Sequence, residues 1–89
     1  MTGSDTVRAW LVERDYGDRN LVTLTYATPD GERELRRELS AAVLRRSSVT
    51  AARDVDPDRL DTVDDGDRRE RYAHEAERVR ERNDPDDAV

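Results

Sequence analysis

The stretch that most constrains the fold is residues 6–39, which hold most of the large apolar side chains, the only Trp and two of the three Tyr. Two runs within it, residues 6–12 and 21–27, are rich in β-branched, aromatic and aliphatic residues. Short runs of this composition between turn residues predict β-strands. We therefore expect a sheet to form here and the remainder of the chain, dominated by Asp, Glu, Arg and Ala, to pack against it.

The first run predicts a central strand. Val7, Ala9 and Leu11 alternate with Trp10 and Val12, so both faces of the strand are apolar. Residues 15–20 then supply turn chemistry, and residues 21–27 alternate apolar side chains with Thr, as in a strand with one half-wet face. We therefore predict that these two strands form a β-hairpin.

Residues 32–39 have two interpretations. As a strand they follow a Thr-Pro-Asp-Gly turn at residues 28–31 and present Leu35 and Leu39 on one face of a charged, edge-like strand. As a helix they place Leu35, Leu39 and Val43 on one side, with Pro29 in the first turn. We favour the strand, because Gly31 would weaken a first helical turn.

The second half predicts a short helix at residues 41–46 capped by Ser40, a weak fourth strand at 49–55 and an Asp-rich connection at 54–67. Asp67 and Glu70 have the spacing of a capping box, and Tyr72, Ala76 and Val79 form an apolar stripe on the helix that follows. The predicted fold class is α+β: a three-stranded antiparallel meander with a possible fourth strand, a short middle helix and a C-terminal amphipathic helix packed on the sheet. With 89 residues we expect a disordered N-terminus (1–5), one domain (6–83) and an acidic, flexible tail (84–89).

The charged residues point to an environment. The chain has 22 acidic residues against 16 basic ones, all of them Arg, for a net charge of −6. An Asp-rich surface without Lys is typical of proteins that work in molar salt, where the Debye length falls to about 3 Å and self-repulsion is screened. No signal peptide or long apolar run occurs at the start, so we expect a cytoplasmic protein with no membrane partner.

Catalytic and cofactor signatures are missing from the sequence. There is no Cys, no Gly-rich phosphate loop and no nucleophile elbow. His74, the only His, has no evident partner for acid–base work. We therefore expect no enzyme, no catalytic residues and no cofactor.

An acidic segment imitates a calcium-binding loop. Asp54, Asp56 and Asp58 alternate like the first three ligands of an EF-hand, and Asp65 falls at the twelfth position. Arg59 stands where that loop requires Gly, so we expect no metal site.

Two binding hypotheses remain. If Val7, Ala9 and Leu11 face away from the helices, they form an apolar patch without a cover, and such patches usually mark interfaces. The leading hypothesis is therefore a small protein-interaction or homodimeric module that binds a protein partner or a second copy of itself. The alternative is a nucleic-acid-associated accessory protein using basic residues within 33–46, although interleaved Glu residues weaken their field. Those residues are Arg33, Arg36, Arg37, Arg45 and Arg46.

The chain also resembles a group of known sequences. Residues 7–14 (Val-Arg-Ala-Trp-Leu-Val-Glu-Arg), residues 25–33 (Thr-Tyr-Ala-Thr-Pro-Asp-Gly-Glu-Arg) and residues 82–87 (Arg-Asn-Asp-Pro-Asp-Asp) are similar to those of small uncharacterised haloarchaeal proteins. The resemblance covers most of the chain and implies a halophilic source. It implies no activity, ligand or site residue.

Overall fold

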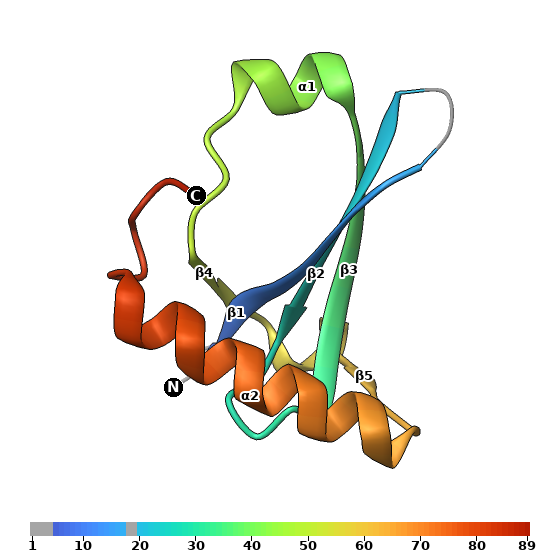
Figure 1. Ribbon diagram of the computed structural model, residues 1–89, viewed down its shortest axis with the longest axis vertical. Helices are drawn as coiled ribbons and strands as arrows, with labels where there is room; N and C mark the ends of the chain where they lie inside the picture. The colour runs from blue at the N-terminus through green and yellow to red at the C-terminus, as the bar shows by residue number, and fades with distance from the viewer. Residues whose placement is uncertain (1–4, 18–19) are drawn as a thin grey trace.

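The computed structural model describes residues 5–17 and 20–89 as a five-stranded antiparallel sheet with a long helix across one face (Figure 1). The α+β prediction is confirmed at this level, and the sheet has five strands rather than three or four. The strand order is β4-β1-β2-β3-β5. The elements are β1 (Val7–Tyr16), β2 (Leu21–Ala27), β3 (Arg33–Ser40), α1 (Ala41–Arg46), β4 (Ala52–Val55), the 3-10 turn η1 (Pro57–Arg59), β5 (Asp61–Thr62) and α2 (Gly66–Arg82).

The ambiguous stretch 32–39 forms a strand from Arg33 onward, so the hairpin interpretation is confirmed and the helical one is wrong. β3 pairs with β2 along its whole length, from Ala27 opposite Glu34 to Leu21 opposite Ser40. The turn between them places Gly31 at a φ of 74°, where glycine is favoured, and the Gly31 N–H donates to the Thr28 carbonyl at 2.8 Å. Turn chemistry therefore outweighs the helical spacing of the leucines.

The Asp30 carboxylate fixes this turn. Its Oδ1 accepts hydrogen bonds from the Thr28 hydroxyl at 2.6 Å and from the Glu32 N–H at 2.9 Å. Because both bonds favour the ionised form, led by the bond from Thr28, they lower the pKa of Asp30 below its ordinary value.

β1 is longer than the predicted strand of residues 6–12. It continues to Tyr16, and its register with β2 shifts between Leu11 and Glu13, which marks a bulge at Val12. The predicted turn at residues 15–20 therefore begins later, and its residues 18 and 19 lie outside the described part of the chain. The first four residues of the predicted disordered N-terminus also lie outside it.

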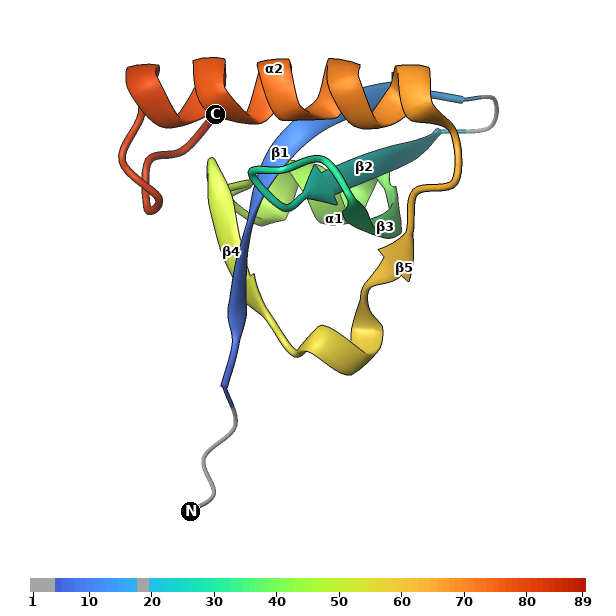
Figure 2. The ribbon, with the colours of Figure 1, turned by 90° about the horizontal axis from the view of Figure 1, so that it is seen from below.

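The sheet is strongly curled. β4 and β5 lie at opposite edges but are joined only through residues 56–60, which include η1. Figure 2 shows β4, η1 and β5 curving round the side of β1 and β2 that faces away from α2. We call the curled side the inner face of the sheet and the side under α2 the outer face.

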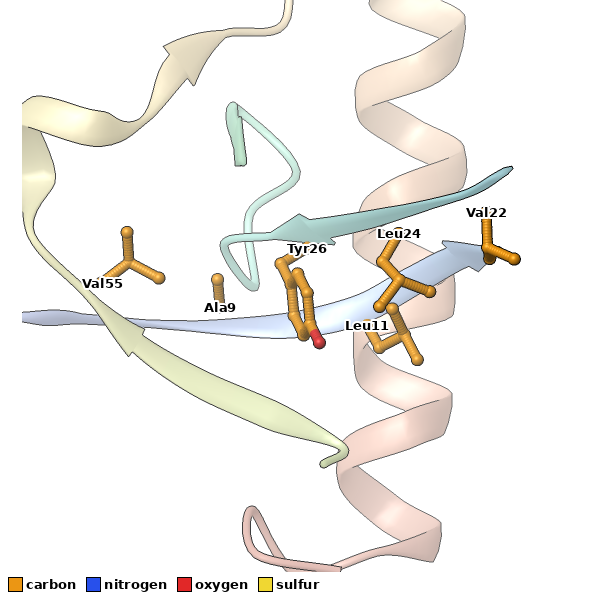
Figure 3. Packing of buried hydrophobic residues seen from close by; sticks show 6 residues of the cluster. All are labelled: Ala9, Leu11, Val22, Leu24, Tyr26 and Val55. Carbon is orange, nitrogen blue, oxygen red and sulfur yellow. The ribbon is translucent and has the colours of Figure 1, made fainter. Parts of the chain in front are cut away.

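The inner face carries the main core, shown in Figure 3, and this corrects a prediction. Ala9 is 0 % exposed and Leu11 is 8 % exposed, while Val7 is half-buried. The expectation that these residues lack a cover within the chain is wrong, because segments other than the last helix supply the cover. The side chains that pack on the inner-face cluster instead come from β3, α1, the segment after α1 and the residue after η1: Leu35, Leu39, Leu44, Val49 and Leu60.

The outer face is covered by α2. Tyr72 and Ala76 are 2 % and 1 % exposed, and Val79 is half-buried, so the predicted stripe is confirmed. The cap differs from the prediction: Asp65, rather than Asp67, is the N-cap, and its carboxylate accepts the Asp67 N–H at 2.9 Å. The helix therefore begins at Gly66, two residues before the start that a cap at Asp67 predicts.

The last residues form part of the fold rather than a loose tail. The Ala51 N–H donates to the Asp87 carbonyl at 2.8 Å, and the Val89 N–H donates to the Val49 carbonyl at 2.9 Å. Residues 84–89 therefore extend the hydrogen bonding beyond the start of β4. Within the described ranges, no helix is both long and apolar enough to cross a membrane.

Candidate functional site

Most of β3 has a strand neighbour on only one side, the side of β2. On the other side, β5 pairs only with Arg33 and Glu34. In the described part of the chain, no strand pairs with residues 35–40 on that side. We call these six residues on this side the free edge of β3.

Hydrogen bonds at the start of β3 establish which residues face the free edge. The Arg33 carbonyl accepts from Thr28 N–H at 3.0 Å, on the β2 side, and the Glu32 carbonyl accepts from Val63 N–H at 2.9 Å, on the β5 side. Backbone groups alternate in direction along an antiparallel strand. The N–H and C=O groups of Arg36 and Glu38 therefore point from the free edge.

The side chains beside the free edge are anchored at one end. Glu34 is 7 % exposed, and its carboxylate lies 2.6 Å from Arg68 of α2 and 3.1 Å from Arg36. The nearby carboxylate raises the pKa of Arg36, and hydrogen bonding to Tyr72 and Glu34 raises that of Arg68. Arg36 is thus held in place, whereas Glu38 is exposed and has no ion pair with a described residue.

A second candidate site lies on the inner face beside α1. It is a pocket of about 250 Å³. Leu24 and Leu39 form part of its wall, and Arg37 of β3 and Arg53 of β4 both line it. We call it the inner pocket. Its polar lining residues are Tyr26, Arg37, Ser47, Ser48, Thr50 and Arg53.

Arg53 is unusual because it occupies an inward position in a short strand. It pairs with Ala9 in the β1–β4 register, and its guanidinium carbon lies 5.8 Å from the centre of the Tyr26 ring. Its Nη1 is buried and has no hydrogen-bond partner among the described residues. Burial raises the pKa of the Tyr26 phenol, while the positive charges of Arg53, Arg37 and Arg14 act in the opposite direction.

The arginines of the nucleic-acid hypothesis do not form one surface. Arg37 lines the inner pocket, whereas Arg36 is paired with Glu34. Arg45 and Arg46 are exposed in the last turn of α1, and Arg33 is exposed at the start of β3. The structure therefore distributes these five residues over both faces of the sheet and one helix end.

The remaining predicted positions are dispersed. His74 is exposed on α2 in a shallow depression shared with Glu70 and Glu77. Asp54 pairs with Arg8 at 3.1 Å, and Asp56 caps η1 by accepting the Asp58 N–H. Over residues 5–17 and 20–89, the structure brings together no group of three His, Cys, Asp or Glu side chains that would hold a metal ion.

Sequence reasoning missed Arg53 as a site residue, although a signal was present. In the predicted strand 49–55, every second residue from Val49 lies on one face. Arg53 lies on that face between Ala51 and Val55, so it is the one basic residue among apolar ones. Arg37 stands in the same way between Leu35 and Leu39. Two arginines, each in an otherwise apolar set of a predicted strand, are the signal in the sequence for a basic pocket on the inner face.

Comparisons with curated proteins and with solved structures give no match. A family model described as a family of unknown function (DUF7967) matches residues 3–89. That description assigns no function and does not favour the nucleic-acid alternative. Since the match covers nearly the whole chain, the protein belongs to this family of unknown function.

Proposed function

We propose that the protein is a small, non-catalytic interaction module that binds a second copy of itself through the free edge of β3. The observation that carries the proposal is the six-residue stretch at 35–40, which no strand in the described part of the chain pairs on one side. An exposed edge is a ready template for an added strand. The interface differs from the one that the sequence predicts, which is buried within the chain.

Antiparallel addition of two copies would satisfy the free backbone groups. Arg36 and Glu38 each offer one N–H and one C=O, so two copies offer four donors and four acceptors. Pairing Arg36 with Glu38 of the second copy, and Glu38 with its Arg36, forms four backbone hydrogen bonds about a two-fold axis. Each such bond contributes about 0.5–1.5 kcal/mol net.

The side chains select this register. It places Arg36 beside Glu38 of the other copy twice, and cross-strand pairs of opposite charge contribute about 0.2–1 kcal/mol each. Shifting the register by two residues in either direction places Arg36 opposite Arg36 or Glu38 opposite Glu38, which is repulsive. The same register places Arg37 opposite Arg37 of the second copy on the inner face, and this one like-charge contact opposes the two favourable pairs.

The pairing is short, so we expect a weak dimer that forms with increasing protein concentration. Sedimentation equilibrium of the full chain over a concentration series should show mass rising from 10.2 kDa toward twice that value. A mass that stays at 10.2 kDa at every concentration contradicts the proposal.

Two charge variants test the register. Arg36→Glu makes positions 36 and 38 both acidic, and Glu38→Arg makes both basic, so each variant alone should remain monomeric. Mixed together, they restore two opposite-charge pairs and should form a one-to-one dimer. Failure of the mixture to associate, or dimers of either variant as stable as wild type, would refute this register.

Matched controls separate the edge from overall charge. Arg45→Glu on α1 and Glu70→Arg on α2 make the same charge changes at exposed positions away from the edge, and they should dimerise like wild type. Circular dichroism of each variant checks that the monomer is folded.

We further propose that the chain works in the salt-rich cytoplasm of a halophile. The support is the net charge of −6 with Arg as the only basic residue besides His74. Concentrated salt screens acidic self-repulsion, so the denaturation midpoint should rise between low and molar potassium chloride. A midpoint that falls over this range would count against salt adaptation.

A further inference from the structure

The inner pocket is basic, although the protein as a whole carries a net charge of −6. Arg37 and Arg53 both line it, and neither forms an ion pair with a carboxylate of the described residues. Among the described residues, five other arginines form such pairs: Arg8, Arg36, Arg68, Arg78 and Arg80. The two guanidiniums therefore keep their charge available to the pocket.

Arg53 supplies the second observation. Its Nη1 has no partner among the described residues, although the atom is buried. Leaving a buried polar donor without an acceptor is costly, so such a group calls for an explanation. The guanidinium carbon of Arg53 lies 5.8 Å from the centre of the Tyr26 ring, which is within cation–π range.

We propose that the inner pocket binds a small oxyanion, with a phosphate group as the ligand class, between the guanidiniums of Arg37 and Arg53. Planar guanidinium forks match the acceptor geometry of phosphate oxygens. The hydroxyls of Ser47 and Ser48 line the same pocket and add neutral donors. Thr50 is not counted, because its hydroxyl already donates to the Ala52 carbonyl at 2.7 Å.

The pocket's size limits the ligand. A volume of about 250 Å³ holds a phosphate group and only a small substituent. Apolar walls formed by Leu24 and Leu39 reduce solvent screening of the arginines. Binding should therefore persist in salt that abolishes phosphate contacts on the open surface.

Isothermal titration of the full chain with inorganic phosphate at constant ionic strength tests the site, and a parallel titration with phenyl phosphate distinguishes the free ion from a phosphate monoester. Wild type should bind at least one of them saturably, and Arg37→Gln should weaken binding about tenfold or more. Arg45→Gln, which removes an exposed charge outside the pocket, should bind like wild type.

Arg53→Gln should weaken binding similarly, and Arg37→Gln keeps the test valid if the Arg53 variant fails to fold. The Arg53 Nε–H resonance should shift during the titration. The proposal is overturned if neither probe binds saturably, if Arg37→Gln binds as tightly as Arg45→Gln, or if chloride alone saturates the site and excludes phosphate. Arg37 also lies opposite its own copy at the proposed two-fold axis, so the mass of Arg37→Gln is measured beside its phosphate titration. Arg53 lies on β4, away from the free edge of β3, so a loss of phosphate binding by Arg53→Gln at unchanged mass tests the pocket separately from dimerisation.

Discussion

Gly31 is the position where one added methyl group should do most damage. Its φ of 74° lies in the left-handed region, and a Cβ built there would lie 2.9 Å from the Ala73 nitrogen and in collision with the Arg69 carbonyl oxygen, both in the α2 backbone. Left-handed strain costs about 1 kcal/mol, and overpacking against an element that must move adds about 1–3 kcal/mol. Gly31→Ala should therefore lose about 2–4 kcal/mol of unfolding free energy.

Urea denaturation at fixed potassium chloride concentration measures this loss. Trp10 is 4 % exposed and belongs to the cluster that includes Ala76 of α2, so its fluorescence reports the affected contact. Gly17→Ala is the matched control, because its new Cβ would meet only the Leu21 carbonyl oxygen at 3.7 Å. It should stay within about 1 kcal/mol of wild type.

A further variant separates the two contributions. Asn tolerates the left-handed region better than Ala but carries the same Cβ. Gly31→Asn should therefore remain strongly destabilised if collision with α2 dominates. The reasoning is refuted if Gly31→Ala unfolds with the same free energy as Gly17→Ala.

Three other predictions follow from ionisable groups. Glu34→Gln should cost about 2 kcal/mol of unfolding free energy, since it leaves the half-buried Arg68 without its carboxylate. Glu75→Gln, which breaks an exposed pair, should cost less than about 0.5 kcal/mol. Equal losses of unfolding free energy in urea denaturation would contradict this difference. The lowered pKa of Asp30 stabilises the fold above the unfolded pKa of about 4, and this stability is lost as pH falls through the folded pKa. The unfolding free energy of Asp30→Asn should therefore fall less steeply with acidification than that of wild type. An equally steep fall would contradict the role of Asp30 in the turn. Because the pKa of Tyr26 is raised in the folded state, the phenol of the unfolded chain ionises first, and stability should fall as pH rises above about 10. Tyr26→Phe should remove part of that fall. An identical dependence of unfolding free energy on alkaline pH would show that another group causes it.

Local patterns in the sequence predicted much of the fold. The β1–β2–β3 meander, the Ser40 cap of α1 and the α2 stripe all depend on residues close together in the chain, and each is present. The i, i+3 spacing of Glu75 with Arg78 and of Glu77 with Arg80 also favours ion pairs on α2, and both pairs are present, at 3.4 and 2.6 Å.

The curl of the sheet could not be predicted from local sequence patterns. It nevertheless determines which residues are buried and which remain available for binding. β5 has only two residues, Asp61 and Thr62, both polar, so no alternation marks it as a strand. Because that strand lies at the opposite edge from β4, the segment with Leu60 closes over Ala9 and Leu11. Ala9 and Leu11, which were expected at an interface, therefore belong to the core, and the proposed interface lies at the free edge of β3.

Hydrogen exchange at that edge tests the proposed self-association most directly. In the monomer the amide protons of Arg36 and Glu38 have no strand partner among residues 5–17 and 20–89, whereas the amides of Arg37 and Leu39 face β2. If two copies pair along the free edge, protection of Arg36 and Glu38 will rise with protein concentration while Arg37 and Leu39 stay protected throughout. Rapid exchange of Arg36 and Glu38 at the highest concentration, with Arg37 and Leu39 protected, would contradict pairing through β3.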